Sequence, residues 1–249
     1  MTGEMLIYLV LAGLAGGFIN GLAGFGTALF ALGFLLQILP PVQAVGLVLV
    51  LSVFSGLQGL WIVRQQIFEH PRRLLRFILP AVIGIPVGVS SLSFIDAELL
   101  KIFIGLFMLF YGGFFALRAN LPTLSGSAPM TDRLVGLIGG ILGGAAGLSG
   151  AIITVWLSMR PYSKNETRAV LQPFNVSVLG LSIIMLALNG AYSLASLVHL
   201  AVIMPAGLVA AQIGIWLFKR LETPQFRRLL IIMMFVSGLI LILRSLFGL

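Results

Sequence analysis

A glycine-rich stretch that occurs twice, 123 residues apart, constrains the fold of this chain more than any other feature. The first copy reads GLAGGFINGLAGFGTA (Gly13–Ala28) and the second reads GLIGGILGGAAGLSGA (Gly136–Ala151). Eight of the sixteen positions are identical, and five of those eight are glycines. Because self-similarity at a fixed offset marks a duplicated structural unit, both halves are predicted to contain the same series of elements.

The composition indicates that a lipid bilayer surrounds this unit. Of 249 residues, 59% are hydrophobic and 9% are charged, and the mean hydropathy is +1.14. Soluble domains carry about 25% charged residues, so this chain cannot present a polar surface on all sides. The chain contains no cysteine, which excludes disulfides, thiolate metal sites and thiol catalysis.

Each half contains two short apolar runs followed by three longer ones. The runs are Met5–Leu22, Phe25–Leu39, Val42–Val63, Leu74–Leu92, Leu99–Leu117, Leu134–Ala146, Leu148–Met159, Val170–Leu188, Leu194–Phe218 and Phe226–Leu243. A polar linker over residues 120–131 separates a first repeat, residues 1–119, from a second repeat, residues 132–249. Twelve residues from Leu148 to Met159 make about 18 Å of helix, too little for a hydrocarbon core of about 30 Å. We therefore expect an all-α polytopic membrane protein with six full transmembrane helices and two pairs of short helices, which either cross fully or are broken or re-entrant.

The basic residues test the relative orientation of the two halves. Five elements per half make the second half enter the membrane from the opposite side. Threading ten passes through the bilayer then puts thirteen of the fifteen Lys and Arg residues on one side, with Lys101 and Arg244 as the exceptions. By the positive-inside rule this side is cytoplasmic and both termini are periplasmic. The same rule accounts for the net charge of +8 better than nucleic-acid binding does. We expect an inverted 5+5 repeat, an arrangement found in secondary transporters.

The glycine stretches have two interpretations. Gly13, Gly17 and Gly21, like their repeats in the second copy, have the GxxxG spacing that allows helices to approach closely in lipid. The ends of the stretches, 24–27 and 147–150, instead predict helix breaks, since glycine adopts left-handed backbone freely. A helix that starts at such a break in mid-membrane presents unpaired N–H groups and the positive end of its dipole. Two such ends, with the hydroxyls of Thr27 and Ser149, would form an anion site.

A few polar residues inside the apolar runs are further candidates. Asn20 lies one turn before the first break, and Gln172 and Asn175 share a helix face. Hydrogen bonding between helices is the alternative role for each of them. Arg168 either binds an anion at the inner mouth or simply follows the positive-inside tendency beside Glu166. No Asp or Glu lies deep in an apolar run, so proton or sodium coupling through a carboxylate has little support, and an intramembrane enzyme lacks its residues.

With these residues together, the chain resembles the sulfite exporter TauE/SafE family, also called TSUP transporters. The resemblance covers nearly the whole length and rests on the two glycine stretches and on Glu166-Thr167-Arg168-Ala169 at the start of a helix. It implies a multi-pass protein of the cell inner membrane that moves sulfur-containing anions such as sulfite or sulfoacetate. Thr27 after Gly26 and Ser149 before Gly150 depart from the glycine-richer family pattern, which leaves the substrate within that class open.

We therefore expect a secondary transporter that exports a small sulfur anion by alternating access. Import, another small anion and, as a different class, a membrane scaffold are the alternatives. The expected partners are the anion and membrane lipid. A coupled proton or other ion, and assembly into a homo-oligomer, are open alternatives. No nucleic acid, metal or cofactor is expected. The expected substrate-binding residues are Asn20, Gly21, Gly24, Phe25, Gly26, Thr27, Gly147, Leu148, Ser149, Gly150, Arg168, Gln172 and Asn175.

Overall fold

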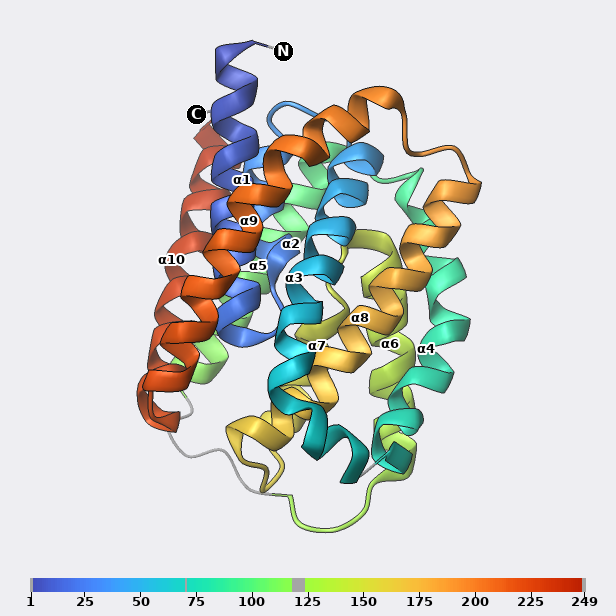
Figure 1. Cartoon of the computed structure of the whole chain (residues 1–249), viewed down its shortest axis with the longest axis vertical. Helices are drawn as coiled ribbons and strands as arrows, with labels where there is room; N and C mark the ends of the chain where they lie inside the picture. The colour runs from blue at the N-terminus through green and yellow to red at the C-terminus, as the bar shows by residue number, and fades with distance from the viewer. Residues whose placement is uncertain (1, 70, 118–123, 248–249) are drawn as a thin grey trace.

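The computed structural model describes residues 2–69, 71–117 and 124–247, and within these ranges it is a bundle of α-helices without strands (Figure 1). The helices are α1 Gly3–Ala23, α2 Thr27–Leu35, α3 Pro41–Glu69, α4 Pro71–Leu92, α5 Ala97–Leu117, α6 Pro129–Ala146, α7 Ser149–Ser158, α8 Lys164–Leu188, α9 Leu194–Arg220 and α10 Thr223–Phe247. In the described part of the chain, five helices are long and apolar enough to cross a bilayer, namely α1, α3, α4, α8 and α9. The predicted all-α polytopic class is thus confirmed. Arg118 and residues 120–123 of the predicted linker lie outside the described residues, as do the side chains of Lys164, Arg227 and Arg244.

Each half begins with a long helix and a short one that folds back along it. A Cβ atom placed on Gly16 of α1 would lie 2.9 Å from Thr27 Cγ2 and 3.0 Å from Ala31 Cβ, both on α2. In the second half, a Cβ on Gly143 of α6 would lie 2.9 Å from Ser149 Cβ at the start of α7. With nine and ten residues, α2 and α7 are about 14 and 15 Å long, half the thickness of a bilayer core.

The start of α6 differs from its prediction. The apolar run begins at Leu134, but the helix begins at Pro129, a residue type that fits the first turn because it has no N–H to satisfy. Asp132 in this first turn is buried, which a count of apolar residues does not register.

The GxxxG glycines pack against helices that are distant in the sequence. Gly17 of α1 lies on the backbone of Gly207 in α9, where an added Cβ would lie 2.7 Å from the Gly207 Cα. Gly140 of α6 lies in the same way on Ala81 of α4, where the corresponding distance is also 2.7 Å. The neighbouring glycines of each stretch repeat these contacts one turn away, since Gly13 and Gly21 face Ile203 and Ala211, and Gly136 and Gly144 face Phe77 and Ile85. The packing interpretation of these glycines is confirmed.

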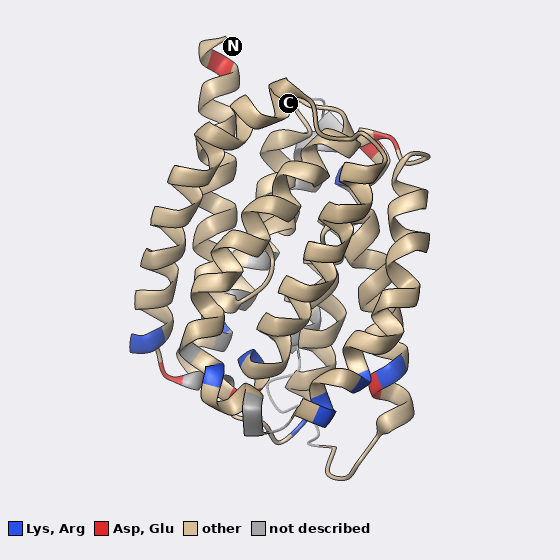
Figure 2. Cartoon of the chain, turned by 45° about the vertical axis from the view of Figure 1, so that its right-hand side comes forward, with Lys and Arg blue, Asp and Glu red and all other residues tan. Residues whose placement is uncertain are grey.

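The remaining long helices pack in pairs, α3 along α8 and α5 along α10. Both ends of the described chain lie at one end of the bundle (Figure 1), whereas Lys and Arg residues gather at the opposite end (Figure 2). We call this the basic end; its described side chains are Arg64, Arg72, Arg73, Arg76, Arg133, Arg160, Lys219, Arg220 and Arg228. The acidic end carries Glu4, Asp96 and Glu98.

Candidate functional site: a polar cavity between two helix breaks

The helices break where the glycines predict. α1 ends with Gly24 at φ +80°, and α2 starts after Gly26 at φ +90°, both in the left-handed region that favours glycine. α6 ends with Gly147 at φ +69°, and α7 starts two residues later at Ser149. The chain therefore reverses at two points inside the bundle.

The helices that start at the breaks begin without a side-chain cap, as α6 also does. The N-termini of α1, α8 and α9 are capped by the side chains of Thr2, Ser163 and Ser193. α2 follows Gly26 and α7 follows Leu148, and no described side chain caps either of them. The first N–H groups of a helix lack an intrahelical acceptor by their position, although here the Ala151 N–H of α7 donates to the Leu148 carbonyl at 3.2 Å. The helix dipole adds partial positive charge at both starts.

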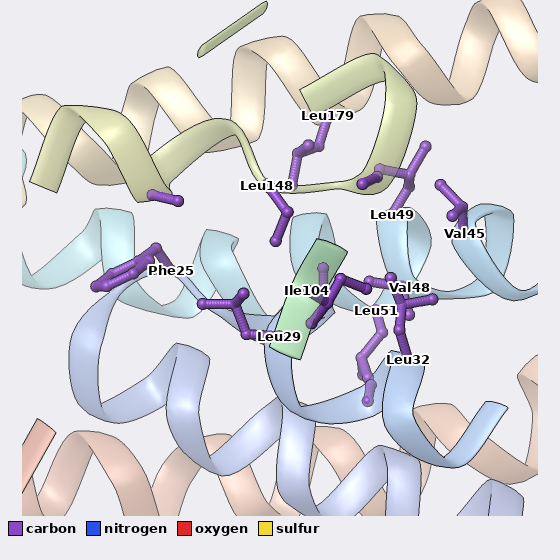
Figure 3. Close-up of a cluster of buried hydrophobic side chains, with 14 of the residues drawn as sticks. Phe25, Leu29, Leu32, Val45, Val48, Leu49, Leu51, Ile104, Leu148 and Leu179 are labelled. Atoms are coloured by element: carbon purple, nitrogen blue, oxygen red, sulfur yellow. The ribbon is translucent and has the colours of Figure 1, made fainter. Parts of the chain in front are cut away.

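Both uncapped starts face one small cavity. Its lining residues are Asn20, Phe25, Gly26, Thr27, Leu29, Ser52, Gly147, Leu148, Gly150, Ala151, Asn175 and Leu179. The cavity has room for about one water molecule. Apolar side chains close one part of it, with Leu148 of the second break lying between Phe25 and Leu29 of the first on one side and Leu179 on the other (Figure 3). None of these described lining residues carries a charged side chain.

Two buried polar atoms in the cavity wall lack a hydrogen-bond partner among the described residues. They are Asn20 Oδ1 and Thr27 Oγ1, on side chains that are 3% and 2% exposed. Asn20 is held in place because its Nδ2 donates to the carbonyl of Ser52 at 2.9 Å. Since buried polar groups are nearly always paired with protein, water or ligand, these two atoms mark a place for a polar guest.

Asn175 joins the two breaks. Its Nδ2 donates to the carbonyl of Gly24 at 2.8 Å, and its Oδ1 accepts from the Ser149 hydroxyl at 2.5 Å. An added Cβ on Gly150 would lie 2.7 Å from the Phe25 Cβ and 2.8 Å from Asn175 Oδ1, so only glycine allows this close approach. One side chain of α8 thus fixes the distance between the two helix starts.

Arg168 and Gln172 lie outside the cavity lining. The Arg168 guanidinium donates from Nη2 to the carbonyl of Gly21 at 2.8 Å and from Nη1 to that of Leu22 at 3.4 Å, and it stacks on the Phe218 ring at 4.2 Å. These contacts make Arg168 a cap for the C-terminal carbonyls of α1. Gln172 donates to the carbonyl of Gly56 at 3.1 Å.

The structure thus brings together eight of the thirteen predicted residues in the cavity wall: Asn20, Phe25, Gly26, Thr27, Gly147, Leu148, Gly150 and Asn175. Ser149 and Gly24 are connected to the site because the Ser149 hydroxyl donates to Asn175 and the Gly24 carbonyl accepts from Asn175. Gly21 is not in the cavity wall, and its carbonyl accepts from the Arg168 guanidinium. Ser52, which aligns with Asn175 under the shift of 123, also lines the cavity, as expected of a polar position repeated in both halves. Among the described residues, no group of three or more His, Asp or Glu side chains is placed to hold a metal ion.

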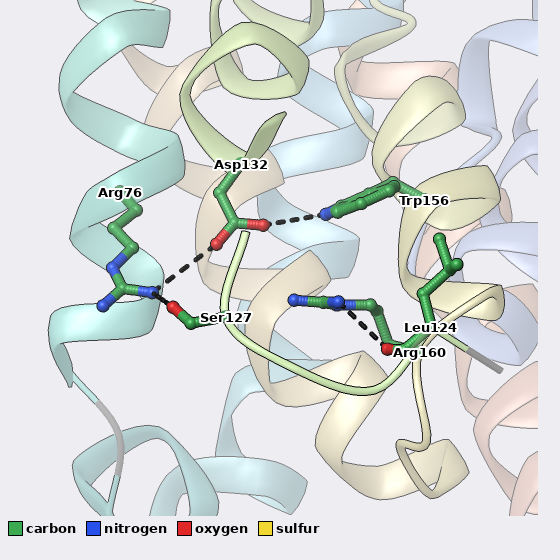
Figure 4. Close-up of polar contacts among 6 residues, drawn as sticks. All are labelled: Arg76, Leu124, Ser127, Asp132, Trp156 and Arg160. Atoms are coloured by element: carbon green, nitrogen blue, oxygen red, sulfur yellow. Dashed lines mark hydrogen bonds and ion pairs between the residues drawn. The ribbon is translucent and has the colours of Figure 1, made fainter. Parts of the chain in front are cut away.

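A polar cluster at the basic end was not predicted. Asp132, 5% exposed, accepts a hydrogen bond from Trp156 Nε1 at 2.8 Å and forms an ion pair with Arg76 at 3.7 Å (Figure 4). Arg160 donates to the carbonyl of Leu124 at 3.0 Å and lies 5.0 Å from the centre of the Trp156 ring. The cluster links α4, α6 and α7 to the chain segment before α6, and Trp156 is buried here rather than exposed to lipid.

The long apolar helices and the enclosed polar cavity define a multi-pass α-helical membrane protein with an internal site for a small polar ligand. The family model described as sulfite exporter TauE/SafE matches residues 9–241, nearly the whole chain, and the protein belongs to this family. It is accordingly a membrane transporter and not an enzyme. Among curated proteins, no sequence matches the chain.

Proposed function

We propose that this protein is a secondary transporter of small sulfur-containing anions, such as sulfite, sulfoacetate or a related organosulfonate. The observation that carries the proposal is that two uncapped helix starts face one cavity whose wall holds the unpaired Asn20 Oδ1 and Thr27 Oγ1. N–H groups at helix starts bind anions without a basic side chain. The Thr27 hydroxyl adds a hydrogen bond that a sulfur oxyanion accepts, whereas Asn20 Oδ1 is itself an acceptor and pairs with a protonated oxygen or a water that accompanies the anion.

The proposed architecture is an inverted 5+5 repeat with residues 1–119 and 132–249 as its halves and six full spans. Its support is reciprocal packing: the first helix of each half lies on the fourth helix of the other half. The contacts of α1 on α9 at Ile203, Gly207 and Ala211 match those of α6 on α4 at Phe77, Ala81 and Ile85, four residues apart in each case. Equivalent helices of the two halves also pair, α3 with α8 and α5 with α10.

We further propose that the basic end faces the cytoplasm of a cell with an inner membrane, so that both termini are periplasmic. The positive-inside rule supports this orientation. The positive potential at the basic end would also raise the local concentration of anions at a cytoplasmic entrance, which favours export.

The size of the cavity supports transport by alternating access. With room for about one water molecule, it cannot hold sulfite and its four non-hydrogen atoms unless the two breaks move apart. Asn175 holds the breaks together through its bonds to Gly24 and Ser149. An entering anion accepts the Ser149 hydrogen bond in place of Asn175 Oδ1, which releases the second break from Asn175, while the bond from Asn175 to Gly24 of the first half remains.

Flux measurements in reconstituted vesicles test the proposal, using labelled sulfite, sulfoacetate and sulfate. Thr27→Val and Ser149→Val remove hydroxyls from the two helix starts and are expected to reduce flux about tenfold or more each, the loss of one or two hydrogen bonds to a charged group. Thr154→Val is the matched control, because the Thr154 hydroxyl donates to the Gly150 carbonyl of its own helix at 2.7 Å and is not in the cavity wall.

Folded protein without flux of any sulfur anion would contradict the proposal and favour a scaffold. If flux follows the imposed gradient in either direction, the protein is still a transporter. The direction of transport in the cell is then set by the anion concentrations on the two sides and not by the protein. Equal flux in Thr27→Val, Ser149→Val and Thr154→Val would reject the two hydroxyls as ligands.

A further inference from the structure

Buried polar atoms without a partner gather on one side of the central cavity. Within the described residues they are Asn20 Oδ1, Thr27 Oγ1, Ser55 Oγ, Gln58 Oε1, Gln66 Oε1, Arg168 Nε and Gln172 Oε1. The first two belong to the cavity itself. The other five belong to α3 and α8, which pack against each other. All five lie between the cavity and the basic end, because α3 runs toward that end and α8 runs away from it (Figure 1).

The helical rise gives the spacing of these groups. Ser52 of α3 and Asn175 of α8 line the cavity. At 1.5 Å per residue, Ser55 and Gln172 each lie about 4.5 Å closer to the basic end, and Arg168 lies about 10.5 Å closer. The unpaired groups therefore follow the helix pair instead of clustering at one point.

Along this line, glycines of α3 let the Gln172 amide approach the α3 backbone closely, and a proline of α8 leaves a carbonyl without its helical donor. An added Cβ on Gly56 or Gly59 of α3 would lie 3.0 or 2.8 Å from atoms of the Gln172 amide group. Pro173 has no N–H, so the carbonyl of Ala169, four residues earlier, lacks its helical donor. Ala169 in turn lines a small pocket at the basic end, with Gln66, Ile67, Arg73, Leu74, Glu166 and Val170.

The same two helices are apolar between the cavity and the acidic end. The fully buried residues of α3 in this part are Ala44, Val45, Leu47, Val48, Leu49 and Leu51. On α8, Ser182 is buried, and its hydroxyl donates to the Val178 carbonyl of its own helix at 2.9 Å. Val48 and Leu49 also pack against the Gly147 break, where an added Cβ would lie 3.6 and 3.4 Å from them. Figure 3 shows Val45, Val48, Leu49 and Leu51 of this part among the buried hydrophobic side chains, and no described side chain of α3 or α8 in this part has a buried polar atom without a partner.

We propose that the α3–α8 interface is the route between the central cavity and the basic end, and that this conformation is closed toward the acidic end. Buried polar groups that lack a partner are costly when dry, so their alignment indicates a line that water enters. Among the described residues, Arg168 forms no ion pair with a carboxylate, and its Nε–H has no partner, which makes it the point on the route where a small anion binds in transit. The nature of the anion rests on the proposed function, whereas the route itself does not.

Because the chain has no cysteine, single-cysteine variants report access along the route. The probes are 2-sulfonatoethyl methanethiosulfonate, a small sulfonate, and its cationic trimethylammonium analogue, applied to either side of sealed vesicles and followed by intact mass. Gln65→Cys at the basic end and Ser93→Cys at the acidic end, both exposed, calibrate the two sides. Ser55→Cys tests the route, and Val48→Cys in the apolar part of α3 is its matched control.

We expect Ser55→Cys to react roughly tenfold faster than Val48→Cys, from the side that modifies Gln65→Cys, since thiol reactivity follows access. The anionic probe should react faster than the cationic one, and this preference should disappear in Ser55→Cys/Arg168→Gln and persist in Ser55→Cys/Arg168→Lys. Should Arg168→Gln fail to fold, Ser55→Cys/Gln172→Leu, which keeps the charge and removes a polar group from the route, is expected to slow both probes.

Reaction of Ser55→Cys at the rate of Val48→Cys, or from the side of Ser93→Cys, would overturn the route. An unchanged preference for the anionic probe without Arg168 would overturn its role in transit. Labelling requires no transport, so a labelled route in a protein without sulfur-anion flux would reject the proposed function and leave the route intact.

Discussion

The contact between α1 and α9 gives the most direct test of the packing, through Gly17→Ala. An added Cβ at Gly17 would overlap the Gly207 carbonyl oxygen and lie 2.6 Å from its carbon and 2.7 Å from its Cα. Nonbonded carbon atoms prefer about 3.5–4.0 Å, so the two helices must separate by about 1 Å. Backbone cannot move aside as a flexible side chain can. Overpacking of this kind costs about 1–3 kcal/mol.

The expected change is measurable in detergent as the temperature at which half of the protein loses its monodisperse elution peak. For a chain of this length, 2 kcal/mol corresponds to a decrease of about 4–8 °C. Gly180→Ala on α8 is the matched control, because an added Cβ there meets nothing within 4 Å. That variant should be neutral or more stable, since alanine in a helix is favoured over glycine by about 0.5–1 kcal/mol.

The second half should respond as the first does, because Gly140 lies on Ala81 as Gly17 lies on Gly207. Gly140→Ala is therefore expected to lower the transition temperature by a similar amount. If Gly17→Ala and Gly180→Ala have the same transition temperature, the close backbone contact is not a feature of the folded protein and the reasoning is refuted.

Two further predictions concern the ends of the bundle. Asp132→Ala leaves Trp156 Nε1 without its acceptor and should destabilise the protein by about 1–3 kcal/mol, whereas Asp132→Asn keeps an acceptor and should cost less; equal losses in thermal unfolding would show that the hydrogen bond is unimportant. At the acidic end, burial raises the pKa of Tyr192 to about 12, and its hydroxyl donates to the Gly46 carbonyl at 3.1 Å. Because the folded pKa is above the ordinary value of about 10, this stabilisation is complete below about pH 10 and is lost as the pH rises toward about 12. The transition temperature of Tyr192→Phe should therefore fall less steeply over that pH range than the transition temperature of the unchanged protein.

The sequence was sufficient for features that depend on local chemistry. Gly24 and Gly147 adopt left-handed backbone because glycine alone does so without strain, and their duplication distinguished them from incidental glycines. The GxxxG spacing predicted that α1 and α6 pack closely, again from local pattern. It did not name the partner helix, because a glycine face accepts any helix with small or accommodating residues, and Gly207 lies 190 positions after Gly17 in the chain.

Features that depend on partners far apart in the sequence were beyond local patterns. Arg168 meets the carbonyls of Gly21 and Leu22 across about 146 residues, and its role as a cap follows only from that meeting. Asp132 precedes the apolar run that begins at Leu134, yet it is buried, and Trp156 supplies it with a donor 24 residues later. A tryptophan near a helix end usually lies at the membrane interface. Trp156 is buried instead, and the contact that distinguishes it is its hydrogen bond to the Asp132 carboxylate.

The preference for an anion follows from how the two breaks use their opposite dipole ends. Every break creates a helix C-terminus with unpaired carbonyls and a helix N-terminus with unpaired N–H groups, which would attract opposite charges equally. At the first break, Gly24 N, Arg168 and Asn175 donate to the carbonyls of Asn20, Gly21, Leu22 and Gly24. At the second, the N–H groups of Gly147 and Leu148 donate to the carbonyls of Gly143 and Leu142. These carbonyl groups are thereby satisfied by the protein, while the starts of α2 and α7 have no side-chain cap and contribute Gly26, Thr27, Gly150 and Ala151 to the cavity wall. The site acquires its positive character in this way from backbone alone, without a basic side chain in its wall.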